Sequence, residues 1–223
     1  MLFNLPPSLI AALTGFLSGF LLSVPVGPVN LTIMNEGARR GLLWALMIGF
    51  GAVTMEVIYC ALAFTGFAAF FTGPKMKAAM ELTSFVFMLY LGLLFLNRRK
   101  VEMPSEMEER IEGRINPHSA FALGFVRVMA NLGVFAGWIV LAASFISHGW
   151  VQPTWTGKLF CVIGVAAGTG LWFSGLSYAV SRGHKKFTEL TLLRMEHFSG
   201  VCMLILAMGY GSYMAWQMAK YKI

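Results

Sequence analysis

A helix-breaking segment, SVPVGPVN, lies inside an apolar run at residues 9–34. It places Pro25, Gly27 and Pro28 within four positions, and a proline both lacks a backbone donor and clashes with the preceding helical turn. Inside a membrane, freed backbone groups are tolerated where they line a cavity or are capped by protein. Freed carbonyl groups suit an ammonium ion, and the N-terminus of a half-helix suits a carboxylate. Together with Asn30, the segment predicts a binding site; the alternative is a plain proline kink satisfied by neighbouring helices.

Three polar side chains, Glu56, Arg127 and Asn131, lie inside other apolar runs. A charged group at the centre of a membrane helix costs about 2.5–3.5 kcal/mol on insertion scales, so Glu56 must face the protein interior, be protonated or have a partner. One hypothesis pairs Glu56 with Arg127 as a structural ion pair. The other makes Glu56 a proton carrier or the anchor for a cationic group, while Arg127 extends to the membrane interface.

Asn131 follows Arg127 by four residues, so the two side chains share one face of a helix. An asparagine inside a span suits either contact with a ligand or a hydrogen bond between helices, and the sequence leaves both interpretations open. The glycines of the neighbouring spans indicate close helix packing rather than chemistry; they are Gly49, Gly51, Gly164, Gly168 and Gly170.

No motif for catalysis, metal binding or a cofactor is apparent. The histidines have no metal-ligand spacing such as HxxxH and no Ser/His/Asp set accompanies them; they are His118, His148, His184 and His197. The three cysteines all lie in apolar runs and form no CxxC pair, which is typical of buried, unreactive thiols; they are Cys60, Cys161 and Cys202. We therefore predict a protein that is not an enzyme and uses no cofactor.

The composition indicates an all-α integral membrane protein. Of the 223 residues, 57% are hydrophobic and 12% are charged, whereas a soluble domain has about 25% charged residues. The net charge of +7 lies mostly in short loops between apolar runs, which favours membrane topology and lipid headgroups over nucleic acid as its explanation. The first ten residues contain no Lys or Arg, so we interpret the first apolar run as a retained span.

Six apolar runs predict six transmembrane helices, at residues 9–34, 42–71, 76–96, 121–146, 159–180 and 195–218. The longest polar segment, residues 97–118, is interpreted as a linker between a first three-helix unit, residues 1–96, and a second, residues 119–223. With three spans each, the two units enter the membrane in opposite orientations, as inverted repeats do.

Weak internal similarity and depth agree with two repeats. GFLLSVPVGP from Gly19 can be aligned with GFVRVMANLG from Gly124. Counted from the same membrane face, Pro25 and Asn131 lie about 14 Å and 15 Å deep at about 1.5 Å per residue, near the midplane. A central site between the repeats follows from that placement.

The loops predict the orientation of the chain. One set of loops holds eleven Lys and Arg residues and the opposite set holds five. Because cytoplasmic loops are enriched in these residues, the richer set is expected in the cytoplasm and both termini are expected outside.

The stretch GFLLSVPVGPVNLTIMNEGARRGLLWALMIGFGAVTMEV resembles the LysE/RhtB family of amino-acid exporters. Gly27, Pro28 and Asn30 match the family's P-G-P and following Asn, with Pro25 standing where P-V-G-P replaces the tighter motif. Gly37, Arg40 and Gly41 match the family's cytoplasmic turn. Gly49, Gly51 and Glu56 match its glycine-rich second span, which carries an acidic residue.

The second half resembles the family less closely. Gly124, Phe125 and Asn131 match its G-F…N-P segment, but Leu132 replaces the usual proline, and Glu56 stands where Asp is more common. The resemblance implies a multi-pass exporter of the bacterial inner membrane that moves amino acids or close derivatives outward, driven by a proton or sodium gradient. Its partners would be the lipid bilayer, the substrate and the coupling ion; a homo-oligomer is left open.

Three other functions would each require features of their own. A divalent-metal exporter of a neighbouring six-span family would need acidic or histidine clusters in its spans or loops. A transmembrane thiol relay would need paired cysteines near the broken segment, which contains none. A purely structural or chaperone-like membrane protein would carry out no transport.

Overall fold

Every regular element that the computed structural model describes is an α-helix, so the predicted class is confirmed for residues 5–25, 27–67, 74–99, 119–182 and 189–221. The first half of the chain contributes α1 (Pro7–Ser23), α2 (Pro28–Arg40), α3 (Leu42–Phe67) and α4 (Pro74–Asn97). The second half contributes α6 (Ala120–Ala130), α7 (Leu132–Ser147), α8 (Trp155–Arg182) and α9 (Glu189–Tyr221).

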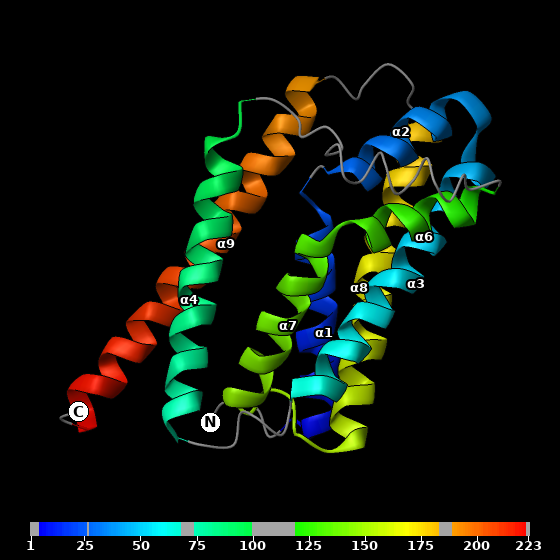
Figure 1. Cartoon of the computed structure of the whole chain (residues 1–223). Helices are drawn as coiled ribbons and strands as arrows, with labels where there is room; N and C mark the ends of the chain where they lie inside the picture. Colours follow the sequence, from blue (N-terminus) through cyan, green and yellow to red (C-terminus); the bar gives the residue numbers. More distant parts are fainter. Residues whose placement is uncertain (1–4, 26, 68–73, 100–118, 183–188, 222–223) are drawn as a thin grey trace.

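The long helices run side by side, and two short ones lie across one end of the bundle (Figure 1). α1, α3, α7 and α8 form the main group, while α4 and α9 pack on each other and α4 also contacts α7. α2 and α6 lie across the end where α4 and α8 finish, and α1 begins at the opposite end.

Two of the six predicted helices are broken. α1 and α2 meet at a bend of 70°, as the proline and glycine residues predict. The run at residues 121–146 was expected to be one helix, but α6 and α7 meet there at a bend of 69° around Asn131. α2 and α6 lie across the end of the bundle and not along its axis. The depths of Pro25 and Asn131 were counted along straight helices, so they no longer support a position of the two breaks near the midplane of the membrane.

The hydropathy of the helices fits a multi-pass membrane protein. Among the described residues, α3 and α8 are each long and apolar enough to cross a membrane, and the number rises to four if each bent pair is one span. Large apolar side chains such as Leu43, Ile163 and Ile205 point outward, which suits lipid rather than water. The six-span count and the two three-helix units stay predictions, and most of the linker lies outside the described residues.

The broken helices pack closely on the middle helix of the other half. A Cβ atom on Gly15 of α1 would collide with the carbonyl oxygen of Cys161 in α8, and one on Gly124 of α6 would collide with that of Ile48 in α3. Such contact between backbones is the usual basis of helix association in membranes. Cys161 and Cys60 are fully buried, as predicted, while Cys202 is partly exposed.

Most of the glycines predicted to mediate packing do so. A Cβ atom would meet neighbouring helices at Gly49, Gly51, Gly164 and Gly168. At Gly170 it would meet nothing within 4 Å, so that prediction is wrong. Gly41 has a different role, because its φ of 88° ends α2 in a conformation that L side chains rarely adopt.

Candidate functional site

A cavity of about 160 Å³ lies between the two helix breaks. All seven residues singled out from the sequence line it, namely Pro25, Gly27, Pro28, Asn30, Glu56, Arg127 and Asn131. They reach the cavity from both halves of the chain, together with residues of α1, α4, α7 and α8. A cavity of this size is comparable to one of about 150 Å³ that accepts benzene, so a small ligand fits.

At the first break, one buried side chain replaces the missing helical hydrogen bonds. Asn30, 3% exposed, donates from Nδ2 to the carbonyl oxygens of Ser23 at 3.0 Å and Pro25 at 2.7 Å. Its Oδ1 accepts from Nε1 of Trp172 in α8 at 3.0 Å. These two carbonyl groups are therefore capped by protein, and Asn30 holds the break in shape rather than leaving all of its freed groups open.

The start of α2 faces the cavity with its backbone. Gly27 precedes α2 with no side-chain cap, and Pro28 has no N–H group. The first helical hydrogen bond of α2 runs from the N–H of Leu31 to the carbonyl of Gly27 at 3.1 Å. A Cβ on Gly27 would meet nothing within 4 Å, so this helix N-terminus borders open space and presents its positive end there.

At the second break, a single residue both ends α6 and caps α7. Asn131 adopts φ −87° and ψ 87°, and its Oδ1 accepts from the N–H of Val134 at 3.2 Å. Tyr59 of α3 donates its hydroxyl to the carbonyl oxygen of Met129 at 2.7 Å. The amide side chain of Asn131 thus has a capping role within its own chain segment, which neither of the two interpretations from sequence anticipated.

Glu56 provides a carboxylate to the lining of the cavity. It is 7% exposed, and its Oε2 accepts from Nε1 of Trp138 in α7 at 2.7 Å. Arg127 of α6 lines the same cavity as Glu56. A tryptophan thus contacts the carboxylate directly, and the pairing of Glu56 with Arg127 stays a prediction.

The charged groups of the lining come from three different elements. Glu56 belongs to α3, Arg127 to α6, and Arg98 follows the end of α4. An ammonium group suits the carboxylate, while a carboxylate suits the guanidinium groups and the N-terminus of α2. Such a lining is able to hold both ends of a zwitterion. Among the described residues, no group of three or more His, Cys, Asp or Glu is arranged to hold a metal ion.

Four residues of the site were missed from the sequence: Tyr59, Arg98, Trp138 and Trp172. The first and the last two act through contacts that span 70 to 142 residues of chain, and no local pattern reports such contacts. Arg98 lies just after the predicted run at residues 76–96 and is one of the eleven Lys and Arg residues of the richer loop set, so its charge is explained there by membrane topology.

Comparison with known proteins identifies a family and a relative that is similar in sequence. A model of the LysE type translocator family matches residues 20–220. A Bacillus subtilis (strain 168) protein named "Putative amino acid efflux protein YcgF" is 25% identical over 193 residues, which cover 86% of this chain and 91% of that protein. No solved structure matches.

Proposed function

The chain belongs to the LysE family of translocators, and from this premise we propose that it exports amino acids by exchange for protons. The name of the Bacillus subtilis relative supports amino acids as the cargo. The resemblance to exporters and the eleven Lys and Arg residues of one loop set support a bacterial inner membrane protein with both termini outside.

The observation that carries the proposal is the cavity with charges of both signs between two helix breaks. An amino acid would place its ammonium group against Glu56 and its carboxylate against Arg127 and the start of α2. All three lie where irregular backbone lines a cavity, which is how many secondary transporters build their binding sites. Pro25, Gly27, Pro28, Asn30 and Asn131 would shape the site through the backbone rather than by charge.

Glu56 is the proposed coupling residue. An ionised carboxyl group inside a span is costly, so an empty site favours a bound proton and a loaded site favours the substrate ammonium group. Proton and substrate would then compete for one carboxylate, which is the requirement for exchange. The site offers fewer oxygen ligands for a sodium ion, because the freed carbonyl groups of Ser23 and Pro25 already accept hydrogen bonds from Asn30.

Alternating access would come from movement between two inverted halves. α1 packs on α8 and α6 packs on α3, so each broken helix contacts the middle helix of the other half. This crossed packing supports the inverted repeat, and a rocking motion of one half against the other would reshape the cavity at their junction.

The test is uptake into inside-out membrane vesicles that contain the full-length protein. The vesicles would be offered a panel of amino acids and divalent metal ions, with and without an acidic lumen. Uptake of one or more amino acids that rises with the pH gradient is the expected result. Uptake of metal ions alone, or amino acid uptake indifferent to the pH gradient, would refute the proposal or its coupling step respectively.

A further inference from the structure

Glu56 is held by a tryptophan that belongs to the other half of the chain. Trp138 of α7 is 1% exposed and lies outside the cavity lining, and its Nε1 donates to Oε2 of Glu56 at 2.7 Å. An indole N–H group donates a hydrogen bond but accepts none. A hydrogen bond to a charged acceptor is roughly twice as strong as one to a neutral acceptor, so this contact favours the ionised form of the carboxyl group.

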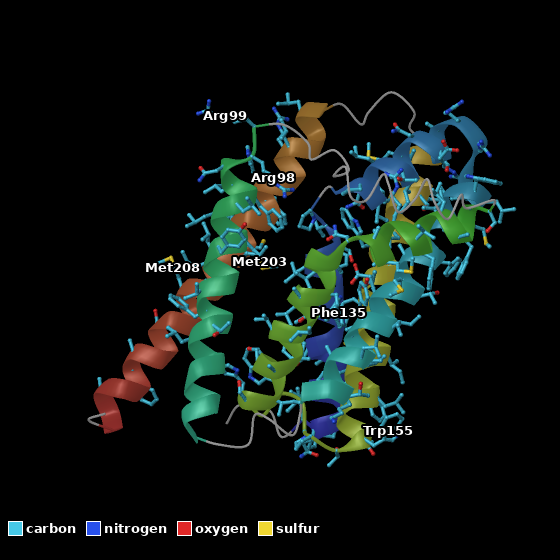
Figure 2. The ribbon with its side chains drawn as sticks, viewed as in Figure 1. Arg98, Arg99, Phe135, Trp155, Met203 and Met208 are labelled. Carbon is cyan, nitrogen blue, oxygen red and sulfur yellow. The ribbon has the colours of Figure 1, made fainter. Side chains whose placement is uncertain are left out.

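The packing of α7 on α3 fixes this contact. Phe135 lies three residues before Trp138 on α7 (Figure 2), and its ring centroid is 4.8 Å from that of Tyr59. Tyr59 follows Glu56 by three residues on α3, and its hydroxyl donates to the carbonyl oxygen of Met129 at 2.7 Å. Two aromatic side chains of α7 thus contact neighbouring turns of α3, and packing holds the indole beside the carboxylate as well as its hydrogen bond does.

Exchange of substrate for a proton requires Glu56 to release its proton. Removal of a carboxylate from water disfavours its charged form, so a buried carboxyl group without support would keep the proton and exclude the substrate ammonium group. A carboxylate has about four acceptor positions, so one hydrogen bond at Oε2 leaves others for the proton or the ammonium group. On the basis of the exchange described above, we propose that Trp138 is a positioning residue that stabilises ionised Glu56 and thereby sets the pH range in which proton and substrate exchange.

A second tryptophan provides a matched control. Trp172 of α8 also donates one hydrogen bond from its Nε1 to a side chain of the cavity lining, that of Asn30, at 3.0 Å. The amide of Asn30 does not titrate. Loss of either indole N–H group removes one hydrogen bond and some packing, but only the loss at Trp138 acts on a group that binds a proton.

Other titratable or charged groups lie around Glu56 on α3, α6, α8 and at the end of α4; they are Tyr59, Cys60, Arg98, Arg127 and Cys161. α2 and α7 also pack on α3, with such groups on the outer face of α2 and at the far end of α7; they are Glu36, Arg39, Arg40 and His148. All of these groups are the same in the wild type and in a variant of either tryptophan. A difference between the two tryptophan variants is therefore assigned to the indole N–H group that was removed.

The experiment titrates Glu56 in the purified full-length protein by infrared difference spectroscopy, with the proton itself as the probe. The absorption of a protonated carboxyl group that is missing in Glu56→Gln identifies the residue. Trp138→Phe keeps an aromatic ring and removes the donor, so the pH midpoint of this absorption is expected to rise by about one unit. In Trp172→Phe the midpoint should stay at the wild-type value, although stability falls. The pH dependence of amino acid uptake into inside-out vesicles should move with the midpoint in Trp138→Phe.

A second measurement uses the wild-type protein, so it does not depend on the folding of a tryptophan variant. The protein contains six tryptophans, and isotope labelling of the indole nitrogens resolves their N–H signals by NMR. One indole signal is expected to shift with pH at the infrared midpoint of Glu56. The same shift should be absent in Glu56→Gln.

The outcomes separate this inference from the proposed function. An unchanged or lower midpoint in folded Trp138→Phe would overturn the inference, and so would an equal rise in Trp172→Phe. The inference also fails if none of the indole signals follows the titration of Glu56. A higher midpoint in Trp138→Phe together with uptake that is indifferent to the pH gradient would instead support the role of Trp138 and contradict proton exchange as the driving step of export.

Discussion

The two helix breaks bend the chain by 70° and 69°, yet they are built from different residues. The first uses Pro25, Gly27 and Pro28, which interrupt a helix by their own backbone chemistry. The second uses Asn131, which ends one helix and caps the next with its side chain. The first leaves open backbone beside the cavity, and the second presents the charge of Arg127 to it.

Both breaks are held by the opposite half of the chain. Trp172 of α8 donates to Asn30 at the first, and Tyr59 of α3 donates to the carbonyl of Met129 at the second. A local signal therefore starts a break, while tertiary contacts fix its shape. Because these contacts cross between the halves, a movement of one half against the other would act on both breaks at once.

The largest effect is expected from Glu56→Gln, which removes the carboxylate that both breaks face. Glutamine is nearly isosteric and still accepts from Trp138, so the fold should be retained. Without a titratable group, uptake into inside-out vesicles should lose its response to the pH gradient almost completely. Glu36→Gln is the control, since Glu36 forms a surface ion pair with Arg40 at 2.9 Å on α2, a contact typically worth about 0–1 kcal/mol. Gradient-driven uptake by Glu56→Gln at the wild-type rate would remove the coupling role.

The next largest effect is expected from Gly27→Leu, which tests the open backbone of the first break. Gly27→Leu should fill the cavity, because a Cβ at Gly27 meets nothing within 4 Å and the longer side chain extends into the same space. Uptake should fall to the level of vesicles without the protein, while thermal stability in detergent changes little. Gly27→Ala is the matched control, because its φ of −111° suits any residue, and it should retain substantial uptake. Normal uptake by Gly27→Leu would show that substrate does not pass this backbone.

Asn30→Ala tests how the first break is held. It removes a buried amide that forms three hydrogen bonds, each typically worth about 1 kcal/mol, so a loss of about 2–4 kcal/mol in unfolding free energy is expected. Thermal unfolding of the purified protein and uptake should both fall strongly. Asn30→Asp keeps the acceptor for Trp172 but loses both donors, and it should lie between Asn30→Ala and the wild type.

Asn131→Ala should have the smallest effect of the four. It removes a helix cap, which typically costs about 1 kcal/mol, while Tyr59 still holds the carbonyl of Met129. Uptake should fall only several-fold, and Asn131→Asp, which preserves the cap, should restore most of the lost stability. A larger loss of stability for Asn131→Ala than for Asn30→Ala would reverse the comparison between the two breaks.

The sequence was sufficient to predict features with local causes. The six apolar runs correspond to the observed helices or bent pairs, because hydropathy and length determine them. The break at Pro25, Gly27 and Pro28 follows from the backbone limits of those residue types. All seven candidate residues line one cavity, since uncommon polar groups inside apolar runs tend to face one another.

Features with distant causes were not predictable. The break at Asn131 has no proline, and it depends on a capping bond and on Tyr59 from another helix. Trp138 contacts Glu56 across 82 residues of chain, and no charge in the sequence pointed to this tryptophan. Side-chain charge suggests which residues can pair, but helix packing decides which of them meet.

The most direct test of the central claim is substrate protection of a cysteine placed at the cavity. Gly27→Cys would react with a hydrophilic maleimide in vesicles, and Ala38→Cys, exposed on the same helix α2, is the control. Both rates would be measured with and without a saturating concentration of the amino acid that the protein transports. The account predicts slower labelling at position 27 with substrate and no change at position 38. Equal rates at position 27, in a variant that still transports, would contradict a substrate site between the two breaks.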